Sequence, residues 1–407
     1  MNNDTLREFA NIALDAGLGL APGAMLRIAG EMPQRELMYA VARGAYERGA
    51  RFVRIDYDDV RLARIRADLC KDDYLEALSE LVERESEILV KEGWSYLRID
   101  GYESPDSMEG ADQTRLTRMQ RARGRAVRAL REAQMSSRIP WCVMPGPTDA
   151  WARQVLGPAA TAEDLWKTLI PILRLDQPDP VALLRRHIAE IEARCVRLNA
   201  LNLSGLHFRG PGTDLDIGLA PESLWQGGGE RTPGGTVFLP NIPTEEVFTT
   251  PDFRRTSGSV TLTRPVRIRG SVIQGGRLVF RGGEVVDYSA ERGGDALGRY
   301  IETDRGARRL GEVALVDMSS PIWRSGLIFD SMLLDENASC HIALGAGYDP
   351  AFAGAESWSD SVKEERGFNV SFVHEDLMIG SEEIDVIGRD AQGKEIPLIR
   401  RGRFVEA

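Results

Sequence analysis

The texture of the sequence changes near residue 200, and this change constrains the fold more than any other feature. Up to that point helical and extended patterns alternate, and a last long helical pattern runs from Asp179 to Asn202. Such alternation is typical of an α/β domain with a largely parallel sheet. From Gly205 onward, short extended runs are broken by glycine-rich turns. We therefore expect an α/β N-terminal domain at 1–190 and an α+β, strand-rich C-terminal domain at 191–407.

Hydrophobic periodicity gives the elements of both halves. In the first half, strands are expected at Met25–Ala29, Phe52–Tyr57, Ser95–Ile99 and Trp141–Met144, and helices at Thr5–Ala16, Arg35–Arg48, Asp72–Lys91 and Asp112–Gln134. In the second half, strands are expected at Leu206–Arg209, Thr236–Leu239, Ser259–Thr263, Val266–Ile268, Arg277–Phe280 and Glu284–Tyr288. No strand of the first half is followed by the glycine-rich loop that a nucleotide phosphate needs, so this sheet does not indicate nucleotide binding.

Histidine is scarce, so the positions of the few histidines are informative. Two of the four, His341 and His374, lie late in the chain, in the stretch that also holds Glu312 and Asp376. His374 and Asp376 are two residues apart, so on an extended segment both side chains point to one face and could reach one cation. Imidazole and carboxylate ligands suit zinc, cobalt or manganese, whereas a structural zinc site normally recruits cysteines. The four cysteines show no paired spacing.

Two glutamates of the second half stand out by their surroundings. Glu246 follows Glu245 in a segment bounded by prolines, where two adjacent carboxylates serve packing poorly. Glu312 interrupts the apolar strand pattern of Leu310–Val316, and burying its charge is costly unless the carboxylate is paired or binds a metal. These glutamates are therefore candidate metal ligands.

Five ordered blocks, which together span nearly the whole chain, resemble signature segments of the thermophilic aminopeptidase family of metallopeptidases. The blocks are Ile139–Trp141 with Pro147–Ala152, Pro211–Leu219, Asn241–Thr249, Gly311–Val316 and Asn369–Gly380. The resemblance implies a centre of two divalent metal ions, which could be zinc, cobalt, manganese or magnesium. It assigns the ligands as Glu246, Glu312, His341, His374 and Asp376, with Glu312 bridging the two ions.

The resemblance also suggests roles for two further side chains. Tyr348 matches the active-site tyrosine of the family and could donate a hydrogen bond to the oxyanion of the tetrahedral intermediate. Glu336 has two interpretations of equal weight: it binds metal or transfers protons, or it is an ordinary acceptor that orients His341. Glu245 is a spare carboxylate that could recognise the free α-amino group of a substrate.

The function implied by the resemblance is that of a metal-dependent aminopeptidase, which hydrolyses N-terminal residues from short peptides with a water activated by two metals. The resemblance also implies a homodimer. One alternative is a metallohydrolase of the same scaffold that acts on a non-peptide amide or an aromatic amine. A mononuclear iron oxygenase would need only two histidines and one carboxylate, and Glu246 and Glu312 would then be superfluous. A binding module without catalysis is the third alternative.

Charge and hydropathy exclude other classes of partner. The formal net charge of −11 argues against nucleic acid, whose binding requires basic patches. The basic stretch Arg118–Arg131 alternates with apolar positions and predicts the solvated face of a helix. We expect no membrane attachment, because no segment has the length and apolarity of a bilayer span. The absence of an export signal and of paired cysteines favours a cytoplasmic location.

Overall fold

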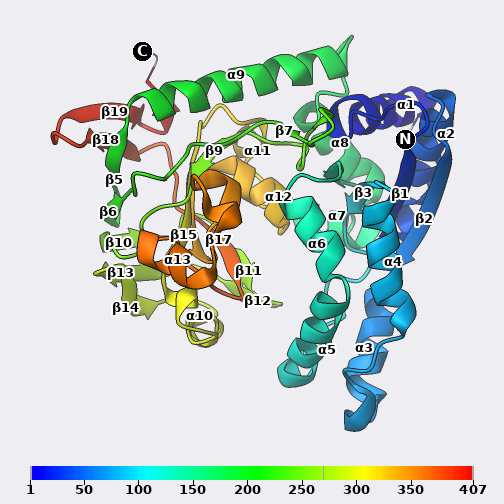
Figure 1. The fold of residues 1–407 in the computed structure, drawn as a ribbon, viewed down its shortest axis with the longest axis horizontal. Coiled ribbons are helices and arrows are strands. Elements are labelled where there is room, and N and C mark those ends of the chain that lie inside the picture. The colour runs from blue at the N-terminus through cyan, green and yellow to red at the C-terminus, as the bar shows by residue number, and fades with distance from the viewer. Residues whose placement is uncertain (1, 269, 406–407) are drawn as a thin grey trace. The chain divides into compact units, whose positions relative to one another are not determined.

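Two units make up the chain, which the computed structural model describes over residues 2–268 and 270–405 (Figure 1). The first unit extends to Arg186 and also includes Gly229–Pro243, and the second comprises His187–Gly228 and the described chain from Thr244 onward. Helix α9 (Pro180–Ala200) therefore carries the chain from the first unit into the second. The division between residues 190 and 191 stays a prediction, and residues 229–243 lie with the first unit.

The first unit is built on a four-stranded parallel sheet in the order β2-β1-β3-β4. Its strands are β1 (Met25–Glu31), β2 (Phe52–Asp58), β3 (Ser95–Asp100) and β4 (Trp141–Pro145). All neighbouring strands pair in parallel. The predicted α/β domain with a parallel sheet is therefore confirmed.

The two faces of this parallel sheet differ in chemistry. One face carries Leu26, Ile28 and Leu97, all fully buried, and helix α2 (Arg35–Glu47) packs on this part of the sheet. On the other face, Arg27 lies opposite Arg54 in the pairing of β1 with β2. Parallel sheets are normally apolar on both faces, so the charged face is a departure from the usual pattern.

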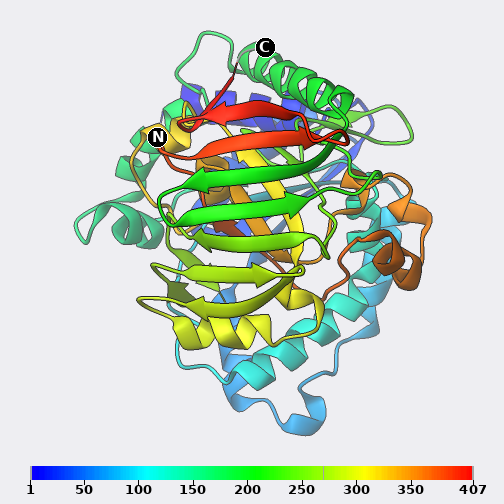
Figure 2. The same ribbon diagram turned by 90° about the vertical axis from the view of Figure 1, so that its left-hand side faces the viewer.

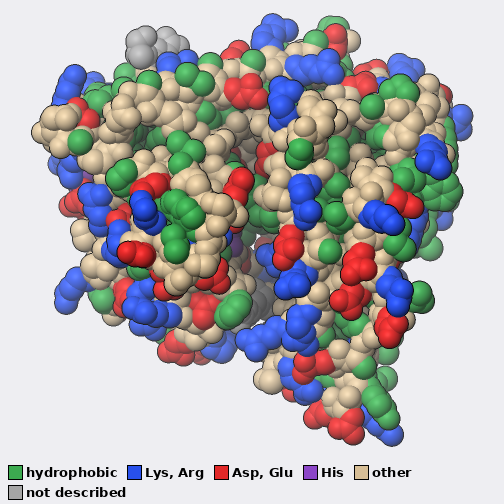
Figure 3. Space-filling view, in the orientation of Figure 1, with side chains coloured by type: hydrophobic (Ala, Val, Ile, Leu, Met, Phe, Trp, Pro, Cys, Tyr) green, Lys and Arg blue, Asp and Glu red, His purple; other side chains and the backbone are tan. Residues whose placement is uncertain are grey.

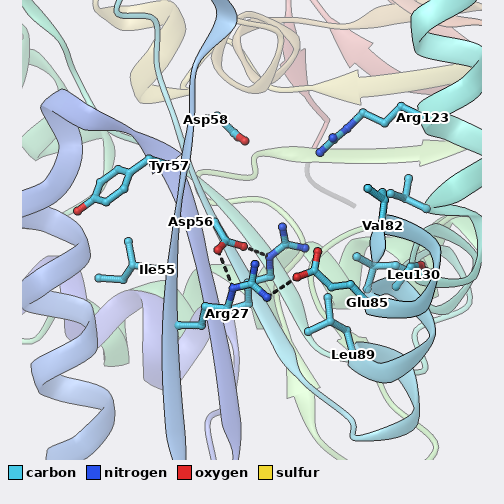
Figure 4. A pocket seen from close by; sticks show the side chains of 13 residues that line it. Arg27, Ile55, Asp56, Tyr57, Asp58, Val82, Glu85, Leu89, Arg123 and Leu130 are labelled. Carbon is cyan, nitrogen blue, oxygen red and sulfur yellow. Dashed lines mark hydrogen bonds and ion pairs between the residues drawn. The ribbon is translucent and has the colours of Figure 1, made fainter. Parts of the chain in front are cut away.

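Ion pairs stabilise the charged side chains of this face, which line a cavity of about 500 Å³ (Figure 4). Asp56 accepts hydrogen bonds from Nε of Arg27 at 2.6 Å and from Nε of Arg54 at 2.7 Å. Arg54 also pairs with Glu85 of helix α4 (Glu80–Lys91). These guanidinium and carboxylate groups neutralise one another, which explains how charged side chains are accommodated against the sheet.

The helices of the first unit differ from two predictions. Besides α2, α4 and α9, the unit contains α1 (Asn3–Asn11), which continues as a π-helical turn at Ile12–Gly17, α3 (Val60–Leu69), α5 (Gln113–Ala126), α6 (Arg128–Met135), α7 (Asp149–Leu156) and α8 (Ala162–Ile172). The helix predicted from Asp72 begins only at Glu80, because Ser79 caps it by accepting a hydrogen bond from the amide of Leu81. The helix predicted at Asp112–Gln134 is two helices, which meet at Val127 with φ −99° and ψ 13°.

The basic stretch of α5 and α6 is exposed at Arg121, Arg123 and Arg131, and other arginines of these helices pair with acids. Arg118 and Arg125 both pair with Glu76, and Arg115 pairs with Asp72. On the face shown in Figure 3, blue and red side chains are interspersed over these helices. The prediction of a solvated helix face is therefore confirmed.

The second unit contains an eight-stranded antiparallel sheet, seen face-on in Figure 2, in the order β14-β13-β10-β6-β5-β18-β19-β20. Its strands are β5 (Leu203–Gly210), β6 (Thr213–Gly218), β10 (Thr256–Thr261), β13 (Arg277–Arg281), β14 (Glu284–Ser289), β18 (Asp385–Asp390), β19 (Glu395–Arg400) and β20 (Arg403–Phe404). Alternate residues of β5 and β6, such as Leu206, Phe208 and Leu215, are buried. This antiparallel sheet confirms the prediction of a strand-rich C-terminal half.

A second, four-stranded antiparallel sheet has the order β17-β16-β15-β9. Its strands are β9 (Glu246–Thr249), β15 (Leu310–Val316), β16 (His341–Gly345) and β17 (His374–Met378). A short ribbon of the second unit pairs β11 (Val266–Ile268) with β12 (Ser271–Ile273), and the remaining helices of that unit are α10 (Gly294–Ile301), α11 (Pro321–Arg324), α12 (Met332–Asp335) and α13 (Asp360–Arg366). Another ribbon, which pairs β7 (Glu230–Arg231) with β8 (Val237–Phe238), belongs to the first unit. Among the described residues, no helix combines the length and apolarity needed to cross a membrane.

Candidate metal centre

The four-stranded sheet collects the predicted metal ligands on one of its faces. Residues directly opposite each other in a sheet share a face, as do residues two apart on one strand. Glu246 lies opposite Val316, four residues after Glu312 on β15. His341 lies opposite Ala314, which is two residues after Glu312. The pairing of β16 with β17 adds the last two ligands, since Asp376 lies opposite Ala343 and His374 lies opposite Gly345.

Small residues occupy this face between the ligands. Ala314, Ala343 and Gly345 present at most a methyl group there, which leaves space above the sheet for polar side chains. Gly345 has φ 114°, and a Cβ at this position would collide with the carbonyl oxygen of Val373. Glycine is therefore required where β16 passes close to the segment that leads into β17.

The ligand side chains form two groups that share one carboxylate. Glu246, Glu312 and His341 make up the first group, and Glu312, His374 and Asp376 the second, with the potential ligand atoms of each group within 4.8 Å of one another. Oε1 of Glu312 lies 3.6 Å from Nε2 of His341, and Oε2 lies 3.8 Å from Nε2 of His374. The two oxygens of one carboxylate thus face two different imidazoles.

The hydrogen bonds of the two histidines direct one ring nitrogen of each toward the carboxylates. Nδ1 of His341 lies 3.2 Å from the carbonyl oxygen of Ser339, and Nδ1 of His374 lies 2.7 Å from that of Ala346. A carbonyl oxygen can only accept, so each Nδ1 carries the proton. In a neutral ring Nε2 then presents its lone pair, which is the arrangement that metal-binding histidines adopt.

Two buried carboxylate oxygens support the fit to cations. Oε2 of Glu246 and Oδ1 of Asp376 have no hydrogen-bond partner among the described atoms. The same oxygens lie 3.1 Å from Nε2 of His341 and 3.4 Å from Nε2 of His374, outside hydrogen-bond geometry. Facing lone pairs at these separations repel each other unless a proton or a cation lies between them. The residues present therefore fit divalent metal ions.

The pKa shifts of these side chains indicate a cluster that retains protons. Burial alone would lower the pKa of His374, but the charges of Asp376 and Glu312 raise it to about 10. Burial opposes protonation of His341 too, and Glu246 and Glu312 nevertheless raise its pKa well above the ordinary value. Burial raises the pKa of Glu312, and the neighbouring carboxylates add to that effect. Cations would replace the protons that keep this cluster of acids together.

Glu336 stands outside both ligand groups. It begins a 3₁₀ turn at Glu336–Ala338, and its Oε1 accepts a hydrogen bond of 3.3 Å from the side-chain amide of Asn337. Burial raises its pKa well above the ordinary value, and the charges of Glu246 and Asp376 raise it further. A carboxyl group that is coupled to both ligand groups and readily holds a proton is suited to proton transfer.

Tyr348 lies at the end of the loop that follows β16. Its ring packs edge-on against Phe248 of β9, with 5.6 Å between the ring centroids. Phe248 lies opposite Ala314 and hence on the ligand-bearing face of the sheet. The amide of Tyr348 donates to Oγ1 of Thr250 at 3.0 Å, which fixes the backbone beside β9. Tyr348 is therefore positioned next to the face that carries the ligands.

Glu245 lies outside both ligand groups, and its predicted role stays a prediction. Its side chain is only 7% exposed, and its Oε2 lies 3.1 Å from Nε2 of His187 on α9. Successive residues of an extended segment point to opposite sides, so Glu245 is directed away from the face reached by Glu246. The geometry pairs Glu245 with an imidazole and gives it no part in either ligand group.

Two buried asparagines hold the site and were not singled out from the sequence. Oδ1 of Asn337 accepts from the amide of Glu245 at 2.7 Å, so one side chain fixes both the turn before Glu246 and the carboxylate of Glu336. Nδ2 of Asn369 donates to the carbonyl oxygen of Gly345 at 2.6 Å. Their only sequence signals are that Asn369 begins the block Asn369–Gly380 and that Asn337 directly follows Glu336.

Comparison with known proteins supports the same assignment of family. The model of the thermophilic metalloprotease family (M29) matches residues 2–404. The chain is 38% identical to aminopeptidase T of Thermus aquaticus over 99% of its own length and 98% of that protein, and 33% identical to aminopeptidase PepS of Streptococcus thermophilus over 99% and 98%. The solved structure of wild-type AmpT from Thermus thermophilus superposes with a TM-score of 0.92 at 36% identity, covering 99% of both chains. The chain therefore belongs to the thermophilic metalloprotease family M29 and is a metallo-aminopeptidase.

Proposed function

We propose that this enzyme removes N-terminal residues from short peptides with a site that binds two divalent metal ions. The observation that carries the proposal is the shared carboxylate, because Glu312 directs one oxygen toward His341 and the other toward His374. Glu246 and His341 would complete one site, and His374 and Asp376 the other. Ligands of imidazole and carboxylate type suit zinc, cobalt, manganese and magnesium.

Bound cations of this kind polarise a carbonyl group and lower the pKa of water toward neutrality. The side chains of the chain supply the remaining functions. Glu336 accepts the proton of the attacking water and passes it to the leaving amine, a role consistent with its raised pKa. Tyr348 donates a hydrogen bond to the oxygen that becomes negative in the transition state, as its position beside Phe248 permits.

The preference for a free N-terminus would follow from coordination of the neutral α-amine by a bound cation, because two divalent ions balance the four carboxylates of Glu246, Glu312, Glu336 and Asp376. An acetyl group on the substrate withdraws the lone pair of that nitrogen into an amide. The homodimer and the cytoplasmic location remain predictions, which light scattering and fractionation of the producing cells can test.

Hydrolysis of matched substrates with free and acetylated N-termini tests the proposal. Chelator-treated enzyme should be inactive, and zinc, cobalt, manganese or magnesium added singly should restore cleavage of the free substrates only. Equal cleavage of acetylated peptides would contradict the aminopeptidase assignment. Metal binding without cleavage of any peptide would favour a related amide or aromatic amine as substrate.

A further inference from the structure

Phe372 is the most exposed large apolar side chain among the described residues. Its side chain is 90% exposed, whereas the other large apolar side chains at the surface do not exceed the 78% of Leu69. It lies two residues before the predicted ligand His374, so the two Cα atoms are at most about 7 Å apart. An exposed aromatic side chain is therefore attached to the backbone that leads directly into a predicted metal ligand.

The backbone that carries Phe372 is firmly anchored. Asp304 accepts a hydrogen bond of 2.8 Å from the amide of Phe372, and both of its carboxylate oxygens lie 2.9 Å from Oγ of Ser371. The carbonyl oxygen of Val373 accepts from the amide of Ala346 at 2.7 Å. The segment is thus tied on both sides of Phe372, and its exposure is not that of a loose loop.

Ser371 and Phe372 differ in how much they contribute to the fold. The hydroxyl of Ser371 is turned toward Asp304, while the ring of Phe372 makes so little contact that it adds almost nothing to the stability of the fold. An exposed aromatic ring on a fixed backbone loses little conformational entropy when another molecule covers it. Its position beside His374 makes the substrate of this site the molecule best placed to do so.

We infer that Phe372 is a specificity-determining residue that packs against an apolar side chain next to the scissile bond of a peptide substrate. This inference rests on the proposed aminopeptidase function. Peptides with leucine or phenylalanine beside the scissile bond would cover the ring and gain apolar burial, whereas alanine or glycine would gain little. The enzyme should accordingly favour large apolar residues.

The test compares the wild type with Phe372→Ala, Phe372→Leu and Leu69→Ala, all loaded with the same metal. Leu69, on α3, is a matched control because it is 78% exposed and belongs to the first unit. One peptide series varies the first residue and a second series varies the second residue, each with glycine, alanine, leucine and phenylalanine. Values of kcat/KM are measured together with metal content and with molar mass by light scattering.

Phe372→Ala should lower kcat/KM about tenfold for leucine and phenylalanine in one of the two series. Its activity on glycine and alanine peptides should stay within about twofold of the wild type, which separates the inference from the proposed function. Phe372→Leu should recover most of the loss, and Leu69→Ala should match the wild type. The inference would be overturned if Phe372→Ala affected all peptides equally or affected none. A smaller molar mass of Phe372→Ala than of the wild type would also overturn it, because Phe372 would then belong to a contact between two copies of the chain.

Discussion

Replacing Glu312 with glutamine perturbs the centre at the one residue that both ligand groups share. The substitution keeps the size of the side chain and removes its negative charge. It also turns one oxygen into an amide that donates hydrogen bonds and repels cations. Because the oxygens of Glu312 face two imidazoles, the structure predicts that both metal sites are weakened together.

The size of the effect follows from the burial and the separations. Glu312 is only 8% exposed, so solvent screens its charge poorly. Two unit charges about 4 Å apart in a protein interact by about 4 kcal/mol at an effective permittivity of about 20. Loss of even that much corresponds to a decrease in affinity of about 10²- to 10³-fold at each site. Activity should fall at least as far at limiting metal concentration.

The assay is a metal titration of chelator-treated protein, followed by calorimetry and by hydrolysis of a free peptide. Glu246→Gln is the internal comparison, because Glu246 belongs to one group only and should weaken one site. Glu302→Gln, at an exposed position, is the control for loss of a remote charge. Normal affinity and activity in Glu312→Gln would refute the shared-carboxylate reasoning.

Three further outcomes are expected. Tyr348→Phe should lower kcat by about tenfold or more and leave the metal content unchanged, as elemental analysis would show; loss of metal would assign the tyrosine to binding instead. Metal affinity should rise by up to tenfold per pH unit as pH increases toward 10, because His374 holds a proton below its pKa of about 10 and the cation must displace it; calorimetry in buffers of different ionisation enthalpy would detect the released proton, and pH-independent binding would contradict this. Asn337→Ala removes the hydrogen bonds of its side chain to the amide of Glu245 and to the carbonyl oxygen of Leu333, so urea unfolding should show a loss of about 2–4 kcal/mol, and an unchanged midpoint would contradict it.

The strands of this protein were predictable because their apolar runs are short and end at clear breaks. The parallel sheet follows from strands such as Phe52–Asp58, and the ligand-bearing strand Leu310–Val316 follows from an apolar run with one charge. The shared face of His374 and Asp376 follows from their spacing. In each case the information is local to a few residues.

What the sequence did not show depends on contacts between distant residues. The break between α5 and α6 falls at Val127, three residues after Gly124, and amphipathic periodicity continues through it. Glu245 and Glu246 read alike in the sequence, yet only tertiary structure pairs Glu245 with His187, 58 positions earlier in the chain. The hydrogen bond from the amide of Phe372 to Asp304 joins segments 68 positions apart. Sequence patterns over a few residues cannot predict partners that are so far apart in the chain.

The most direct test of the account measures activity as a function of bound metal. Chelator-treated protein would be titrated with one divalent ion, while the bound ions per chain and the hydrolysis of a free dipeptide and its acetylated counterpart are recorded. The account predicts that activity on the free dipeptide rises until two ions are bound per chain and that the acetylated dipeptide remains uncut. Full activity without metal, or maximal activity with a single bound ion, would contradict it.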